Sequence, residues 1–358
     1  MTSPSYLDML DELLRPGIAG LSDRFKATQV RFVASCQQVD GGFGGRQGNS
    51  DLYFTDFALR TLAWLAPGHA AFDRAAGYVA DLAWPPGNIT ECFNLLNARR
   101  LLEQRCEGSS CSRGSKTSVI LNAAKDLGRS NLPHEILRCV QDDDNARERS
   151  PSGIAESAAW RWEPALLIEW LRGHLLPSGG FARFADDGRV SAYHTFLGSL
   201  CFQLLEVDMP AIEDAIDAIS ALNRADGGYA ELADQAASQT NATAAAVGFL
   251  VMHDALPPEK AAATARFLAK MQSADGGLKP HAAVASGDLL STFTGLLTLS
   301  SLGGFHEIDA AGVARFLQRT AHPSGGFLAC EGDDTPDVEY TYYGVGTLAL
   351  LRVLAAEA

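Results

Sequence analysis

Apolar residues recur along most of the chain with the 3.6-residue period of amphipathic helices, while the alternation typical of strands is nearly absent. The pattern predicts helices in pairs. An Ala/Leu-rich helix such as 265–272 is followed by a glycine-containing loop and then by a second apolar helix such as 289–299. Neither helix can bury its apolar face alone, so neighbouring pairs are expected to stack on one another.

A Gly-Gly pair followed by an aromatic or aliphatic residue punctuates this pattern. The five copies are Gly41-Gly42-Phe43, Gly179-Gly180-Phe181, Gly227-Gly228-Tyr229, Gly276-Gly277-Leu278 and Gly325-Gly326-Phe327. From the second copy onward, successive copies begin 48, 49 and 49 residues apart. A fixed period of this length predicts a repeat built from helical hairpins.

The first interval is longer than two periods, and residues 107–150 account for the excess. This segment breaks the Ala/Leu helical pattern and resembles none of the other units. We interpret it as a weakly ordered insertion in a single domain that spans 1–358. Without it, a degenerate second unit is found at 75–102, which brings the number of units to six.

Three segments carry a resemblance to a known family: 38–46 (QVDGGFGGR), 272–278 (QSADGGL) and 337–348 (DVEYTYYGVGTL). They resemble the prenyltransferase and squalene-cyclase repeat superfamily, and are nearest to the β subunits of protein prenyltransferases of the geranylgeranyl type II group. The resemblance implies an all-α (α/α)6 toroid, in which six inner helices surround a bore and six outer helices surround them.

Charge, hydropathy and cysteine spacing argue against several classes of function and location. The formal charge is −14, with 43 Asp and Glu against 29 Lys and Arg, which argues against a nucleic-acid surface or docking on anionic lipid. No uninterrupted apolar stretch is long enough to span a membrane, and no signal peptide is visible. Seven scattered cysteines without CxxC spacing favour a reduced, cytoplasmic location.

The resemblance implies a zinc site, but this chain retains only part of it. Family members that transfer prenyl groups bind Zn²⁺ through an Asp-x-Cys pair and a distant His. Here Asp288 is retained, Leu290 replaces the Cys and Tyr340 replaces the His. Because tight zinc binding needs about three protein ligands, the zinc-thiolate route is not expected. If zinc were nevertheless bound, the first replacement ligands to test would be His194, His281 and Cys330.

Two further motifs bear on diphosphate and metal binding. The resemblance implies basic residues around a diphosphate, for which Arg46, Lys279 and His281 are the candidates. Asp333, Asp334 and Asp337 spell a DDxxD magnesium pattern, so Mg²⁺ is an alternative cofactor. Pro336 within that pattern and its place in a Gly-led loop argue against this use. The Asp-x-Asp-Asp acid motif of the superfamily's cyclases is absent.

The six predicted second helices begin at aligned residues: Asp51, Asn88, Ser191, Gln239, Asp288 and Asp337. One interpretation is helix capping, since Asp, Asn and Ser accept hydrogen bonds from free N–H groups at a helix start. The other is that all six starts meet at one rim of the bore. Their partial positive charge would then anchor a diphosphate, or their acids would recruit Mg²⁺.

Residues just inside these starts supply the candidate chemistry. The proposed catalytic set is Asp288, Asp337, Tyr340, His194 and Glu339. The proposed substrate-binding set is Tyr53, Phe54, Tyr193, Phe293, Tyr343, Arg46, Lys279 and His281. Aromatic faces suit an isoprenoid chain or a carbocation, although the same rings serve equally well as packing between helices.

Two function classes remain open from the sequence. The first is an isoprenoid-handling enzyme that binds a prenyl diphosphate in the central cavity and transfers the prenyl group by a zinc-independent route. The second is a non-catalytic toroid that binds or scaffolds, with a terpene-cyclase-like enzyme as a further alternative. The resemblance also implies a helical-repeat α-type subunit as a partner.

Overall fold

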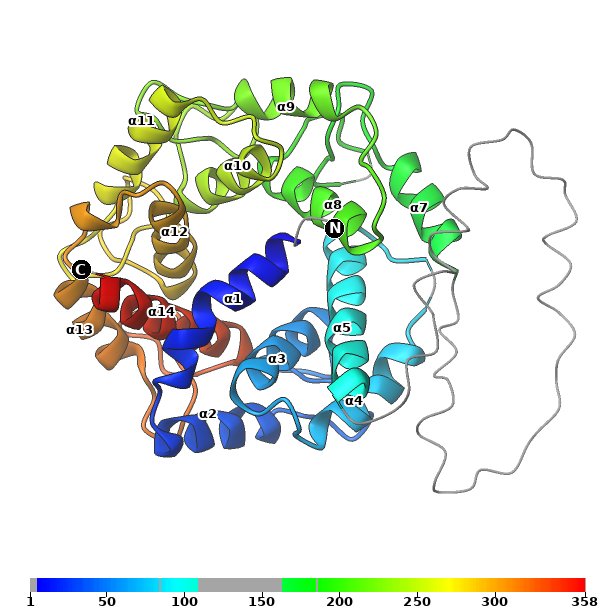
Figure 1. Cartoon of the computed structure of the whole chain (residues 1–358), viewed down its shortest axis with the longest axis vertical. Coiled ribbons are helices and arrows are strands. Elements are labelled where there is room, and N and C mark those ends of the chain that lie inside the picture. The colour runs from blue at the N-terminus through cyan, green and yellow to red at the C-terminus, as the bar shows by residue number, and fades with distance from the viewer. Residues whose placement is uncertain (1–4, 84, 109–162, 185, 358) are drawn as a thin grey trace, which may run out of the picture.

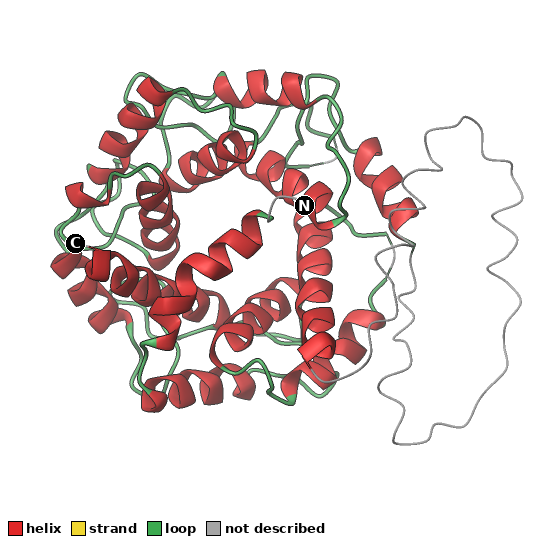
Figure 2. Cartoon of the chain, viewed as in Figure 1, coloured by secondary structure: helices red, strands yellow, loops and turns green. Residues whose placement is uncertain are grey.

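The structure, a computed structural model, describes residues 5–83, 85–108, 163–184 and 186–357. Within these ranges the chain is helical, and β-structure is limited to isolated bridges (Figure 2). The helices, with one short 3₁₀ turn, are α1 (Tyr6–Ala19), α2 (Asp23–Ser35), α3 (Leu52–Leu65), α4 (Ala71–Ala80), α5 (Ile89–Gly108), α7 (Pro164–Gly173), α8 (Ala192–Leu204), α9 (Ile212–Ser220), α10 (Thr240–Met252), α11 (Pro258–Ala269), α12 (Leu289–Ser301), η2 (Phe305–Glu307), α13 (Ala310–Thr320) and α14 (Val338–Glu357).

Six of these helices form a closed inner ring (Figure 1). In order around the ring, α3, α5, α8, α10, α12 and α14 each pack against the next, and α14 packs back against α3. The outer layer consists of α2, α4, α7, α9, α11 and α13, each of which precedes its inner partner in the chain. The predicted all-α (α/α)6 toroid is confirmed.

The Gly-Gly pairs join neighbouring units. The first glycine of each pair has a positive φ, between 76° and 102°, which L-residues with a side chain rarely adopt. Each also lies against the backbone of the next outer helix: a Cβ on Gly41 would lie 2.2 Å from the Arg74 carbonyl oxygen of α4. Gly325 makes the equivalent contact with Thr28 of α2, so the last unit is joined to the first in the same way.

The residue after each glycine pair anchors its loop in the core. Phe43, Phe181, Tyr229, Leu278 and Phe327 are all at most 2% exposed. The backbone N–H of each donates to a threonine hydroxyl on the following inner helix, as Phe43 does to Thr55 at 2.9 Å. The sequence repeat therefore encodes a repeated hydrogen bond, which fixes every loop against the start of an inner helix.

Helix α1 was not part of the predicted repeat, and it crosses the ring at the end opposite to the inner-helix starts (Figure 1). Asp11 accepts a hydrogen bond from the Trp64 indole at 2.8 Å and pairs with Arg100, and the Tyr6 N–H donates to Gln203. These partners lie in the second halves of α3, α5 and α8. One end of the ring is therefore covered by α1, which leaves the helix starts as the other end.

The predicted insertion 107–150 lies outside the described residues, apart from 107–108 at the end of α5. In the part of the chain that the structure describes, none of the helices combines the length and apolarity that a membrane crossing requires.

Candidate functional site

The six aligned residues stand immediately before the six inner helices, as the sequence predicted. Five of their side chains accept a backbone N–H of the first turn, and Gln239 is the exception. The acceptors and donors are Asp51 with Tyr53, Asn88 with Glu91, Ser191 with His194, Asp288 with Ser291, and Asp337 with Tyr340. Capping is thus a shared structural role, whatever further chemistry these residues perform.

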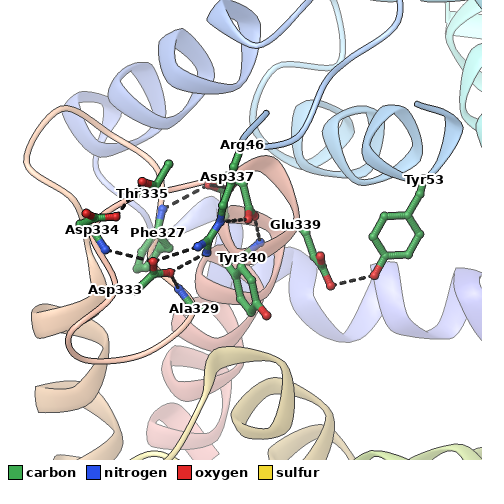
Figure 3. A network of polar contacts seen from close by, with 11 residues as sticks. Arg46, Tyr53, Phe327, Ala329, Asp333, Asp334, Thr335, Asp337, Glu339 and Tyr340 are labelled. Carbon is green, nitrogen blue, oxygen red and sulfur yellow. Dashed lines mark hydrogen bonds and ion pairs between the residues drawn. The ribbon is translucent and has the colours of Figure 1, made fainter. Parts of the chain in front are cut away.

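Arg46 links the first unit to the last (Figure 3). Its Nε donates to Asp337 at 2.8 Å, and its two Nη atoms donate to Asp333 at 2.8 and 2.5 Å. The guanidinium also lies 5.5 Å from the centre of the Tyr340 ring. All three nitrogens are therefore engaged by carboxylates, which leaves Arg46 poorly placed to serve as the predicted diphosphate ligand.

The same contacts bear on the DDxxD interpretation. Burial acts to raise the pKa of Asp333, but the hydrogen bonds from Arg46 and the Ala329 N–H, together with the charge of Arg46, outweigh it and lower that pKa. Asp333 and Asp337 are bridged by the guanidinium, and Asp334 accepts from the Thr335 hydroxyl at 2.8 Å. A cationic side chain thus occupies the position between two carboxylates that Mg²⁺ would need.

The residues present do not fit a family-type zinc site. Asp288 accepts the N–H and the hydroxyl of Ser291, and the two other family positions hold Leu290 and Tyr340. Burial, followed by the charges of Asp333 and Asp288, raises the pKa of Cys330, which disfavours the thiolate that zinc requires. Over the described ranges, His, Cys, Asp and Glu side chains do not gather in a group of three that could hold a metal ion.

Glu339 and Tyr53 face each other across the start of the ring, from α14 and α3 (Figure 3). The Tyr53 hydroxyl donates to the Glu339 carboxylate at 2.7 Å. Burial raises the pKa of Glu339 to about 7; the charges of Asp337 and Asp288 act in the same direction, against the hydrogen bond from Tyr53. A carboxyl group with this pKa can both give and accept a proton at neutral pH.

An aromatic wall continues from this pair into the ring. Phe57 contacts Tyr53, Tyr342 and Tyr343 at ring-centre distances of 4.9, 5.3 and 5.4 Å, and Phe293 lies 5.8 Å from Tyr343. Phe293 and Tyr343 are 3% and 7% exposed, so these two predicted substrate-binding residues form part of a packed wall.

Tyr193 lies in the first turn of α8, with its ring 5.3 Å from that of His194. Burial raises its pKa to about 12, and the charges of Arg60 on α3 and Glu339 on α14 also act on its hydroxyl. Its side chain nevertheless remains 38% exposed. Tyr193 therefore contacts solvent at the end of the ring where the inner helices begin.

His194, next to Tyr193, belongs to a second hydrogen-bonded group. Its Nδ1 lies 2.8 Å from the Ser191 hydroxyl, which also bonds the Glu231 carboxylate. Burial, together with the charge of Arg183, lowers the pKa of His194 to about 4, so the imidazole is neutral at pH 7. Glu231 was not among the residues predicted from the sequence. Its position in the repeat could have identified it. The loop after each glycine pair lies against the start of the preceding inner helix, and the Ala192 N–H donates to the Glu231 carbonyl in this way.

The remaining candidates are dispersed. Phe54 packs against Gly45 and so supports the loop that carries Arg46. Lys279 and His281 lie in the loop between α11 and α12, where the Lys279 carbonyl accepts from Thr240 at the start of α10. That start is across the ring from α3, so the structure does not gather Lys279 and His281 with Arg46.

Comparisons with known proteins agree with this architecture. The chain matches the model of the prenyltransferase alpha-alpha toroid domain over residues 5–92 and 167–358. No curated protein sequence matches it.

Solved structures with the same fold carry different activities. Protein geranylgeranyltransferase-I from Candida albicans, complexed with GGPP, superposes with a TM-score of 0.60 at 13% identity, covering 93% of this chain and 92% of that one. The type II terpene cyclase MstE from Scytonema, in complex with its product merosterolic acid A, gives 0.54 at 14%, covering 98% and 100%. The alpha-1,6-mannanase GH76A from Salegentibacter gives 0.55 at 12%, covering 93% and 99%. At these identities the likeness shows the fold alone.

Proposed function

Because this chain belongs to the prenyltransferase alpha-alpha toroid family, we propose that it is an isoprenoid-handling enzyme that works without zinc. Its substrate would enter the ring at the inner-helix starts and lie along the aromatic wall. The observation that carries the proposal is the hydrogen-bonded Glu339–Tyr53 pair, which lies beside a wall of aromatic rings and in which burial raises the pKa of Glu339 to about 7. Solved neighbours with bound GGPP or a terpene-cyclase product support the substrate class.

The geometry favours proton transfer to the isoprenoid chain. Protonated Glu339 would give its proton to one carbon of a double bond, forming a C–H bond and leaving a carbocation on the other carbon. The faces of Phe57, Phe293 and Tyr343 suit that cation. Loss of a proton from a neighbouring carbon would restore an alkene, so the product would be a cyclised or isomerised hydrocarbon skeleton. This makes the terpene-cyclase-like alternative our leading mechanism.

Prenyl transfer from a diphosphate is the second candidate. It is favoured by the six helix starts and by Lys279 beside the start of α10, since helix N-termini and a lysine attract a diphosphate. Asp288, Asp337 and Tyr340 would border the diphosphate, and His194 would act as a base. The helical-repeat α-type subunit and the cytoplasmic location are proposals of the same kind, as is the non-catalytic scaffold.

The test is incubation of the full chain with farnesyl and geranylgeranyl diphosphates and with geranylgeraniol, in D₂O, with and without Zn²⁺ or Mg²⁺. We expect binding that is independent of zinc, and products that contain one deuterium and retain the diphosphate where the substrate carried one. Release of diphosphate would instead establish transfer. Binding without turnover would identify a scaffold, and absence of binding would overturn the proposal.

Two variants locate the proton. Glu339→Gln is expected to keep binding and lose turnover at least 100-fold, because the amide cannot donate a proton in the same way. Tyr53→Phe removes the hydrogen bond that lowers the pKa of Glu339. It should therefore shift the alkaline limb of the pH profile to higher pH, a result that a purely structural role of Tyr53 would not produce.

A further inference from the structure

A groove lies on the outside of the toroid, where α11 of the outer layer packs on the glycine loop at 225–227 (Figure 1). Its volume is about 430 Å³. Phe267 and Met271 line it and are 3% and 5% exposed. Arg266 and Lys270, one turn apart at the end of α11, line it as well. The groove thus combines apolar side chains with two positive charges.

Both cations of the groove are unpaired. In the part of the chain that the structure describes, the exposed side chains of Arg266 and Lys270 form neither an ion pair nor a hydrogen bond. The acid of the groove, Asp226, is engaged elsewhere, because its Oδ1 accepts the Gly228 N–H at 3.0 Å and the Ser238 hydroxyl at 2.7 Å. Two cations against one acid leave the lining positive, on a chain with a formal charge of −14.

A second copy of this arrangement lies 49 residues further along the chain. A Cβ on Gly227 would lie 2.5 Å from the Ala263 carbonyl oxygen of α11, and a Cβ on Gly276 would lie 2.1 Å from the Gly312 carbonyl oxygen of α13. Both contacts repeat at the same spacing, so α11 and α13 pack on their glycine loops in the same register. Positions in the two units can therefore be compared one by one.

In the second copy, both cations are paired with carboxylates. Arg315 lies 3.1 Å from the Asp309 carboxylate, and Arg319 lies 3.2 Å from the Glu331 carboxylate. Arg319 also donates to the Asp275 carbonyl of the glycine loop. This arginine and its glutamate thus extend across the place that corresponds to the groove.

The groove beside α11 retains the cations of this arrangement and lacks their partners. Counting back 49 residues from Arg315, Arg319, Asp309 and Glu331 gives Arg266, Lys270, Lys260 and Ala282. Lys260 therefore stands in place of Asp309, and Ala282 in place of Glu331. Ala282 itself lines the groove. The absence of a glutamate side chain there leaves both the space and the positive charge unmatched.

We propose that this groove binds a carboxylate on an acidic segment of a partner protein. A glutamate of that segment would lie where Glu331 lies in the next unit, with its carboxylate between Arg266 and Lys270 and its methylene groups against Phe267. Charge-assisted hydrogen bonds to these cations would hold it, and their charge would favour an acidic partner. Asp226 beside the groove disfavours a dianion such as phosphate more than a carboxylate. The site lies outside the ring and does not depend on the proposed function.

The experiment uses a peptide with the sequence of residues 328–334, blocked at both ends, which carries the glutamate of the second copy. A comparison peptide has glutamine at that position. Each is titrated calorimetrically into the full chain in reducing buffer at low salt. We expect the glutamate peptide to bind about 3- to 10-fold more tightly, the range for one or two partly exposed ion pairs. The preference should shrink in 1 M salt.

Two variants locate the carboxylate. Lys270→Ala should abolish the preference by removing a cation, and Ala282→Glu should abolish it because the chain then supplies its own carboxylate to the groove. The matched control is Arg315→Ala on α13, where the cation is already paired, and this variant should keep the preference.

Equal affinity of the wild type for the two peptides would overturn the proposal. A preference retained in both Lys270→Ala and Ala282→Glu would overturn it as well, because the carboxylate would then bind elsewhere. Displacement of the peptide by inorganic phosphate at an equal concentration would overturn the assignment to a peptide carboxylate.

Discussion

The ring contains two arginines in contrasting surroundings. Arg46 lies at the entrance, with a side chain 32% exposed, and each of its nitrogens bonds Asp333 or Asp337 (Figure 3). Arg60 lies deeper, contacts the Asp56 carboxylate and three aromatic rings, and has an Nε without a partner. Both are cations in a ring of helices, yet only one has its hydrogen-bonding capacity satisfied.

The difference separates a partly exposed joint between two units from a buried ion pair whose hydrogen bonding is incomplete. Arg46 joins residues that are 291 positions apart in the chain, and so it holds the first unit to the last. A guanidinium fully engaged by two carboxylates has little left to offer a substrate. Arg60 Nε is enclosed without a hydrogen-bond partner, so burial of this ion pair carries an additional free-energy cost.

The largest effect is expected from Arg60→Met. The substitution leaves Asp56 as an uncompensated buried charge and should lower the free energy of unfolding by about 3–5 kcal/mol. Burial already raises the pKa of Asp56, so the carboxyl group should protonate in the variant, and the loss should be smaller at pH 5 than at pH 8. Urea unfolding at both pH values measures this.

The double variant Asp56→Leu/Arg60→Met serves as the control. Removing both charges should recover most of the lost stability, since the surrounding rings are apolar. A single variant that loses less than about 1 kcal/mol would mean that the pair is solvated, in which case the contrast between the two arginines would disappear.

A smaller effect on the free energy of unfolding is expected from the titration of Glu339. This carboxyl group lies near Arg46 but forms no ion pair with it. The pKa of Glu339 is raised to about 7 from an ordinary value of 4.5, mainly by burial, so the folded state binds this proton more tightly than the unfolded state. The resulting stability is fully present below pH 4.5 and is lost as the pH rises through 7. We expect a contribution of about 3 kcal/mol.

Unfolding of wild type and Glu339→Gln between pH 4 and 8 measures that contribution. The glutamine variant should lose the decline in stability between pH 5 and 7. If both proteins follow the same pH dependence, the carboxyl group is ionised throughout and cannot be the proton donor.

The smallest effect is expected from Arg46→Met, which should cost about 1 kcal/mol because the guanidinium is partly solvated and the pair is screened. The loss should shrink in 1 M salt, whereas the loss from Arg60→Met should change little. Equal salt dependence at both sites would show that burial does not distinguish them.

The sequence predicted features whose signals are local. The six residues before the inner helices were identified correctly because a cap and a Gly-Gly turn mark each start within about a dozen residues. The fold class followed from the period and from the family resemblance.

The hydrogen-bond partners of these residues were not predicted, because they are distant in the sequence and become neighbours only when the ring closes. Nothing in the segment around Arg46 points to Asp337, and α1 carries no mark of the repeat. Two sequence features do indicate such partners. Asp56 and Arg60 are opposite charges one turn apart in an apolar helix, and Glu231 follows its glycine pair at the position that lies on the preceding helix start.

The contact between Gly325 and α2 has a consequence for the connectivity of the protein. Because the joint between the last unit and the first resembles the joints within the chain, the ring does not depend on where the polypeptide begins. In a circular permutant, the chain would be cut in an outer loop and its two ends would be joined by a linker. The six inner helices should then pack in the same order around the ring. The geometry of the ring is then independent of which unit comes first in the polypeptide.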